Sequence, residues 1–254
     1  AIWDDHDYGK NDGGLDYPKR AESAEVFLDV FNVPKDSPRR SRSGIYGAKT
    51  YGEKGKRVQV ILLDTRYFRS TPLVKNKMSK AEKKKKNLVG WYVPTSDTNT
   101  TLLGAEQWAW LEGQLKQKAD VRIIASSVQV VSQEKGMECW GNFPHERQRL
   151  FDLIKKTKAN GALFVSGDVH FSELSVDKGG PYPIYDFTSS GITNSSRGWG
   201  KAVNSLRVGK MYSKPNFGLI SIHWGNESIK LEIKSLTGET HITKDISFDE
   251  LIVK

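Results

Sequence analysis

The sequence predicts an α/β domain in which buried strands alternate with helices, followed by a β-rich C-terminal part. Apolar runs at Val58–Asp64, Val121–Val131 and Leu163–Val165 are typical of buried strands. Helix-like segments separate them, and this alternating order favours an α/β sheet. Acidic residues and histidines follow two short apolar runs, and the functional sites of such folds lie at strand ends.

The first acidic stretch opens the chain as Ala1–Tyr8, AIWDDHDY. Asp4, Asp5 and His6 are consecutive and cannot share one helix or strand face, so we expect them to converge at a bend after a core strand. Carboxylates beside an imidazole suit a metal ion, or a metal-bound anion that needs a proton donor. The alternative is an acidic loop with a helix N-cap, a position that Asp favours.

A polar glycine-rich loop, Gly9–Gly14, follows this stretch. Asn11 and Asp12 are candidates to support the site, but Asn-Asp-Gly-Gly is also ordinary turn chemistry, and we favour the turn. The segment Pro18–Phe31 predicts a helix whose apolar stripe is formed by Ala24, Phe27, Leu28 and Phe31.

Two segments carry concentrated positive charge. The loop Pro38–Arg42 contains Arg39, Arg40 and Arg42, so it either attracts a phosphate-bearing substrate or forms solvated surface, which we favour. The lysine-rich segment Lys75–Asn87 predicts an exposed loop or a solvated helix with no catalytic part.

Arg66 follows the strand predicted at Val58–Asp64. An arginine there would hold a phosphate or brace the acidic site from behind. A purely structural arrangement with Asp64 is an equal alternative.

Two further helices are predicted, at Gly104–Gln117 and from Pro144 to about Lys158. The strand at Val121–Val131 runs into Ser126 and Ser127, and neither serine lies in a G-x-S-x-G motif, which argues against a serine hydrolase. Met137–Phe143 is interpreted as a loop near a cleft or a surface plug, between which the sequence does not choose.

The second acidic stretch is Phe164–Glu173, FVSGDVHFSE. Gly167 permits a tight turn after the strand, and Asp168 and His170 lie on the same side if the backbone stays extended. Such a pair is plausible as half of a metal site. A hydrogen-bonded pair that fixes a loop is the alternative, and two such strand-end groups in one chain favour the metal.

The C-terminal part predicts a strand at Tyr182–Phe187 and then a hairpin of Phe217–Trp224 with Ser228–Leu236. His223 lies on this hairpin and is expected to lie outside the site.

The composition excludes several classes of protein. The chain of 254 residues carries a formal net charge of +9, which favours anionic partners, but its basic residues are too dispersed to predict a nucleic-acid groove. No apolar run approaches the ~20 residues of a membrane span. Cys139 is the single cysteine, so an intrachain disulfide is excluded. Because the sequence does not open with Met, we expect a fragment or a processed chain whose targeting signals are not visible, and the oligomeric state is unknown from the sequence.

Five motifs in order resemble the PhoD-like (alkaline phosphatase D) branch of the calcineurin-like metallophosphoesterases. They are WDDHD at 3–7, LLDTRYFR at 62–69, LLGAEQWAWLEGQL at 102–115, SGDVHFSEL at 166–174 and DFTSSG at 186–191. The resemblance spans most of the chain to about residue 224. It implies a four-layer α/β/β/α sandwich with mixed sheets and a multinuclear metal site that hydrolyses phosphate esters.

By position, the resemblance assigns Asp5, Asp168 and His170 as metal ligands, with Asp5 bridging two metals. It assigns His6 to the phosphate and to protonation of the leaving oxygen, and Asp4 to support of the loop. It implies two or more metal ions, iron with calcium, while zinc, manganese and magnesium remain alternatives. A periplasmic or secreted location and small-molecule phosphate esters as partners are further implications.

The family's first two ligand motifs would precede Ala1, so we expect residues 1–254 to form one domain of this type without its N-terminal part. The predicted activity is hydrolysis of a phosphate ester by hydroxide attack at a multinuclear metal site, with His6 and Arg66 as catalytic candidates. The alternatives are a catalytically incomplete α/β fragment that serves as a binding or structural module, and a nucleic-acid binder.

Overall fold

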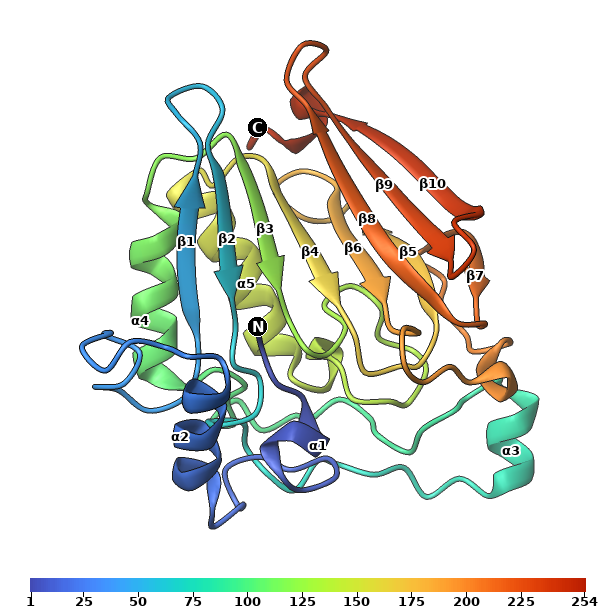
Figure 1. The fold of residues 1–254 in the computed structure, drawn as a ribbon. Coiled ribbons are helices and arrows are strands. Elements are labelled where there is room, and N and C mark those ends of the chain that lie inside the picture. The colour runs from blue at the N-terminus through green and yellow to red at the C-terminus, as the bar shows by residue number, and fades with distance from the viewer.

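The computed structural model describes residues 1–254 and contains two β-sheets (Figure 1). The seven-stranded sheet has the order β1-β2-β3-β4-β6-β5-β7, and the three-stranded sheet has the order β10-β9-β8. Their strands are β1 (Gly47–Tyr51), β2 (Val58–Leu62), β3 (Val121–Ala125), β4 (Ala162–Ser166), β5 (Ser172–Asp177), β6 (Ile184–Ser189), β7 (Arg207–Tyr212), β8 (Asn216–His223), β9 (Ser228–Ser235) and β10 (Thr240–Ser247).

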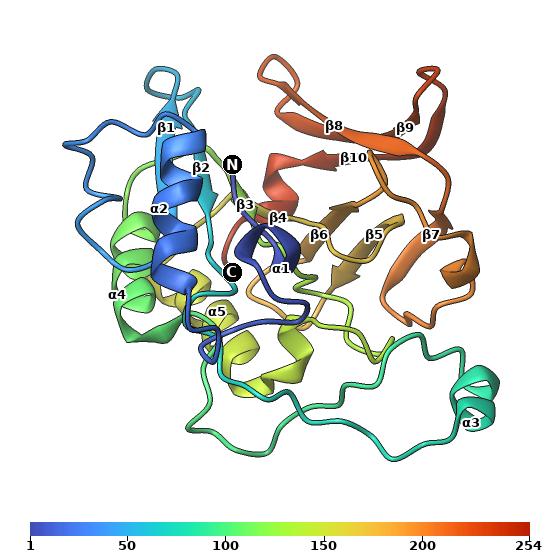
Figure 2. The same cartoon turned by 60° about the horizontal axis from the view of Figure 1, so that its bottom comes forward.

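The central strands β2, β3, β4 and β6 are parallel, whereas β1 and β5 run antiparallel to their neighbours. The carboxyl ends of the four parallel strands therefore meet at one edge of the sheet, at the bottom of Figure 1. The short helix α1 (Asp5–Tyr8) lies in front of this edge, as Figure 2 shows.

Helices α4 (Gly104–Leu115) and α5 (Pro144–Thr157) cover one face of the large sheet, and the three-stranded sheet lies over the other (Figures 1 and 2). Leu111 of α4, Phe164 of β4 and Leu231 of β9 belong to one hydrophobic core. The chain thus supplies the layers α/β/β, and the prediction of an α/β fold with mixed sheets and an antiparallel C-terminal hairpin is confirmed.

The predicted helix at Pro18–Phe31 is observed as α2 (Arg20–Val30). Ala24, Phe27 and Leu28 are buried as expected, but Phe31 is 51% exposed because the helix ends before it. The lysine-rich segment contains a short helix, α3 (Lys80–Lys85), and none of the helices is long and apolar enough to cross a membrane.

One expectation about strands is wrong. Ala1–Trp3 is not a strand: it runs without regular structure into α1, with Trp3 buried against Phe27 and Tyr8. The sequence also gave no indication of four strands, β1, β5, β7 and β10. Three turns of 3₁₀-helix complete the secondary structure: η1 (Trp140–Asn142), η2 (Arg197–Trp199) and η3 (Phe248–Leu251).

Candidate metal centre and cavity

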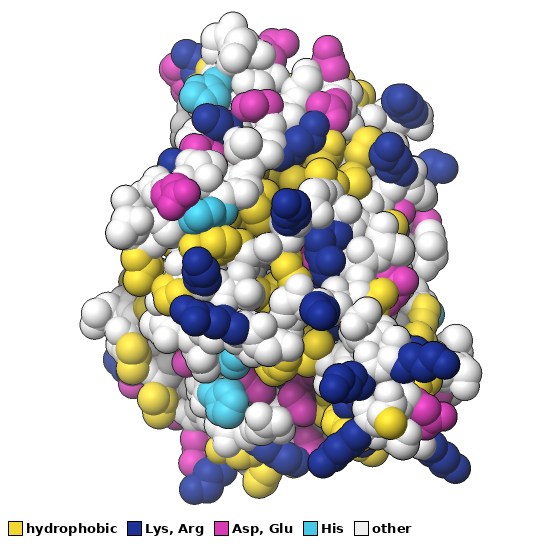
Figure 3. Space-filling model, turned by 90° about the vertical axis from the view of Figure 1, so that its right-hand side faces the viewer, with side chains coloured by type: hydrophobic (Ala, Val, Ile, Leu, Met, Phe, Trp, Pro, Cys, Tyr) yellow, Lys and Arg dark blue, Asp and Glu magenta, His cyan; other side chains and the backbone are white.

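A cavity of about 950 Å³ lies at the edge where the parallel strands end. Figure 3 shows a hollow in the lower part of the molecule, with acidic side chains inside it and basic side chains around it. The carboxylates that line the cavity are Asp4, Asp5, Asp7, Asp12, Glu138 and Asp168. The cavity therefore concentrates negative charge in a chain whose formal net charge is +9.

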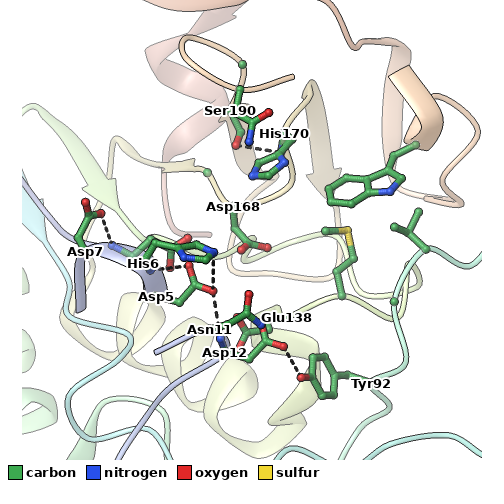
Figure 4. A pocket seen from close by; sticks show the side chains of 18 of the residues that line it. Asp5, His6, Asp7, Asn11, Asp12, Tyr92, Glu138, Asp168, His170 and Ser190 are labelled. Carbon is green, nitrogen blue, oxygen red and sulfur yellow. Dashed lines mark hydrogen bonds and ion pairs between the residues drawn. The ribbon is translucent and has the colours of Figure 1, made fainter. Parts of the chain in front are cut away.

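The opening stretch contributes to the cavity through the turn that begins α1. The Asp5 carboxylate accepts hydrogen bonds from the backbone N–H groups of His6 (2.8 Å) and Asp12 (3.0 Å), which fix it in a buried position. His6 lines the cavity, but its side chain is 81% exposed, and its Nε2 lies 3.9 Å from the Asp5 carboxylate. Asp5 therefore belongs to the floor of the cavity and His6 to its rim (Figure 4).

The stretch after β4 meets this turn. Carboxylate oxygens of Asp4, Asp5 and Asp168 all lie within 4.8 Å of one another, close enough to share a metal ion. The expected extended backbone is not observed, because Asp168 and His170 have φ values of +71° and +54°. These two residues, rather than Gly167, form the left-handed turn that follows the strand.

His170 lies in the same cavity but outside both groups of carboxylates that could share a metal. Its backbone N–H donates to the hydroxyl of Ser190 (3.1 Å). Its ring stacks on Trp199, with the centroids 5.3 Å apart and the planes 15° from parallel. The imidazole is therefore held by an aromatic neighbour, with no carboxylate of the cavity paired to it.

A second group of carboxylates, Asp5, Asp12 and Glu138, also brings its oxygens within 4.8 Å. The sequence-based prediction included neither Asp12 nor Glu138 among the ligands. Asp12 does lie in a turn, with φ +49°, but its carboxylate points into the cavity and accepts a hydrogen bond from the Tyr92 hydroxyl (2.5 Å). Asp5 is common to both groups, so it lies where one carboxylate would bridge two cations.

Arg66 lies behind the carboxylates and is fully buried. Its Nε donates to Asp4 (2.8 Å), its Nη1 donates to Glu138 (2.7 Å), and its Nη2 lies 4.0 Å from Asp168. Its backbone N–H also donates to Asp64 (3.0 Å), so the structural arrangement with Asp64 exists as well. This position favours bracing of the acidic site over direct contact with a phosphate.

The charges in this centre are not balanced. Arg66 and Arg69 are the guanidinium groups that pair with its carboxylates, and both of them pair with Glu138. Burial, together with repulsion from Asp4 and Glu138, raises the pKa of Asp168 well above its usual range. Oxygen-rich, uncompensated sites of this kind match the donor set that hard metal cations prefer.

The three arginines of the loop at 38–42 lie away from the cavity. The Arg42 guanidinium lies 4.0 Å from the ring centroid of Tyr46, Arg40 donates to the carbonyl of Val33, and Arg39 donates to that of Ile45. They are half-buried structural residues, so neither substrate steering nor free solvated surface describes them.

Asn11 does line the cavity, as does Lys75, although no part in the site was expected for the lysine-rich segment.

The segment 89–92 joins the cavity through a close backbone crossing. The backbone N–H groups of Val89 and Tyr92 donate to the carbonyls of Lys135 (2.9 Å) and Gly136 (2.7 Å). A Cβ atom on Gly90 would lie only 1.9 Å from the Gly136 carbonyl oxygen, so this contact requires glycine. The crossing places Tyr92 beside Asp12 and near the loop that carries Glu138.

Comparison with known proteins identifies relatives of this chain. The family model "PhoD-like phosphatase" matches residues 1–221. Alkaline phosphatase D of Bacillus subtilis (strain 168) is 25% identical over 203 residues, which are 69% of this chain and 31% of that protein. A solved structure described as "Structure of PhoD" superposes with a TM-score of 0.64 and 19% identity, over 97% of this chain and 54% of the other. The chain thus spans about a third of the curated relative and about half of the solved one.

Proposed function

This chain belongs to the PhoD-like phosphatase family, and on that premise we propose that it takes part in metal-dependent hydrolysis of phosphate esters. The observation that carries the proposal is the meeting of Asp4 and Asp5 with Asp168, from stretches more than 160 residues apart in the chain. Without cations, the carboxylates of this cavity would repel a phosphate ester. With cations, they would hold positive charge beside its oxygens.

We assign Asp5, Asp168 and His170 as metal ligands and add Asp12 and Glu138, which the geometry brings to the same centre. The carboxylate-rich donor set fits iron and calcium as the proposed ions, with zinc, manganese or magnesium as alternatives. Bound metals would supply a hydroxide nucleophile near neutral pH and would neutralise charge on the phosphate oxygens.

The remaining site residues have roles that follow from their positions. His6, exposed at the rim, would give a proton to the leaving oxygen of the ester. Arg66 would position Asp4 and Glu138 through its hydrogen bonds rather than contact the substrate directly. Asn11 and Asp4 support the turn around Asp5. A periplasmic or secreted location also forms part of the proposal, and it rests on the family alone.

The experiment that tests the function combines metal analysis with hydrolysis of a chromogenic phosphomonoester and a phosphodiester. We expect His170→Ala to lower both metal content and turnover. His6→Ala should keep the metal and lower turnover by about 10²–10⁴-fold, the usual contribution of a general acid. His223→Ala, on β8 and outside the cavity, is the matched control and should change neither.

Two results would contradict the proposal. Normal turnover with a full metal complement in His170→Ala would remove that histidine from the site. Absence of both metal and hydrolysis in the unaltered protein would favour the binding or structural module instead. Steeply salt-dependent affinity for DNA or RNA would identify a nucleic-acid binder, although the acidic cavity offers no surface for it.

A further inference from the structure

Part of the cavity is apolar. Five side chains from three segments line this part, which we call the aromatic wall: Val89, Trp91, Met137, Ile192 and Trp199. Trp91 is 39% exposed and Ile192 is 67% exposed. Large apolar side chains left open beside a functional site mark a surface that binds a partner or ligand.

The aromatic wall adjoins the carboxylates and has a packed base. Trp199 stacks on His170, so the wall begins at a proposed metal ligand. Behind it, Val89, Met137 and Trp199 pack against a small buried cluster of Val169, Phe171 and Ala202. Because Val169 lies between Asp168 and His170, the wall and the metal ligands share one support.

One face of the Trp91 ring is covered by a lysine. The Lys83 ammonium lies 3.2 Å from the centroid of the Trp91 ring, and only 6% of Lys83 is exposed. A cation at this distance from an indole is attracted to the ring. The contact fixes the ring in place, and the Trp91 side chain still lines the cavity and is partly exposed.

The size of the cavity indicates what would lie against the wall. At about 950 Å³ the cavity is at the upper end of the 300–1,000 Å³ typical of sites for drug-sized ligands. A bare phosphate group, with five heavy atoms, would leave most of it empty. The remaining space adjoins Trp199 and Trp91, so the organic part of the ester would fill it.

We propose that the preferred substrates are phosphate esters that carry a flat apolar group, such as an aryl ring, which packs against the aromatic wall. This inference rests on the proposed function, because it assumes that the phosphate lies at the metal centre. Stacking against Trp91 or Trp199 would orient the ester and would be absent for small alkyl esters.

The test compares two diesters, diphenyl phosphate and dimethyl phosphate, in the metal-loaded protein by release of phenol or methanol, because only the first carries an aryl ring. After correction for their uncatalysed rates, we expect kcat/KM to be at least about tenfold higher for the phenyl ester, as is usual for extra apolar contacts in a pocket. Equal values for the two esters would overturn the inference while leaving the proposed function intact.

Variants assign the preference to the wall. Trp91→Ala and Ile192→Ala should reduce the phenyl-to-methyl ratio, whereas Leu236→Ala, equally exposed but outside the cavity, should not. A ratio unchanged in both wall variants would also overturn the inference.

A binding measurement separates the two proposals. Phenylphosphonate should bind the metal-loaded protein at least about tenfold more tightly than methylphosphonate, as measured by calorimetry. If neither diester is hydrolysed but this difference is found, the proposed function fails and the aromatic wall stands. Equal binding of the two phosphonates would overturn the inference that the aromatic wall binds the aryl group.

Discussion

Two buried clusters of charged side chains differ in the balance of their charges. In the first, Glu173 on β5 is fully buried, and its carboxylate forms ion pairs with Lys135 Nζ (2.7 Å) and Arg207 Nε (2.7 Å). Gln129 and Asn204 add hydrogen bonds of 2.9 and 3.0 Å. In the second, the carboxylates around Asp5 share two guanidinium groups.

The pKa values show the consequence of this difference. Burial raises the pKa of Glu173, but Lys135 and Arg207 outweigh it, and the pKa lies below its usual range. Burial and neighbouring carboxylates leave the pKa of Asp168 well above its usual range. A cluster with its own counter-charges leaves no buried charge unpaired, whereas we propose that a cation supplies the missing positive charge in the second cluster.

The largest effect on stability is expected when the Glu173 carboxylate, which balances Lys135 and Arg207, is removed. Glu173→Ala leaves Lys135 and Arg207 buried without a partner and should lower the free energy of unfolding by about 3–5 kcal/mol. Urea denaturation measures this change. Glu239→Ala, whose side chain is 72% exposed, is the control and should change stability by less than about 0.5 kcal/mol. Equal effects of the two substitutions would show that the Glu173 cluster contributes no special stability.

Addition of metal should act on the unbalanced cluster alone. A metal ion at 100 times its dissociation constant should raise the free energy of unfolding by about 2.7 kcal/mol, and a chelator should reverse this. Thermal denaturation with a monovalent salt of equal ionic strength controls for screening. If Asp5→Asn responds to the metal as strongly as the unaltered protein, the stabilising ion is bound elsewhere.

The smallest expected effect concerns pH. Because the native pKa of Asp168 is raised, the native state of the metal-free protein binds more protons than the unfolded state above about pH 3.9. This contribution to stability therefore falls as pH rises toward the native pKa. Asp168→Asn should remove the decline and stabilise the metal-free protein by about 1 kcal/mol at neutral pH. A less stable variant at neutral pH would mean that the attraction between Asp168 and Arg66 outweighs the repulsion.

Elements with a strong apolar pattern were predictable from the sequence. Helices α4 and α5 bury regularly spaced side chains, and strand β9 buries Ile229, Leu231 and Ile233, so their periodicity was visible. Strand β1 (GAKTY) is exposed over four of its five residues and exists because it pairs with β2. Such a strand has no periodic signal of its own, and its position depends on tertiary pairing.

The site was predictable in part for similar reasons. The acidic stretches around Asp5 and Asp168 lie next to apolar runs, so their meeting could be anticipated from the order of elements. Asp12 was not identified as a possible ligand because the Asn-Asp-Gly-Gly segment that contains it also forms an ordinary turn. Glu138 lies in a loop without periodicity, far along the chain from its partners Arg66 and Arg69. The burial of Arg66 and Arg69, which calls for an acidic partner, is visible only in the folded structure.

The contact between Gly90 and Gly136 limits how this protein can be redesigned. One side of the crossing continues into Trp91 and Tyr92, and the other continues into Met137 and Glu138. An insertion or deletion on either side would shift the aromatic wall and the acidic centre together. Selectivity should therefore be engineered by exchanging side chains at fixed loop length, which leaves this shared joint undisturbed.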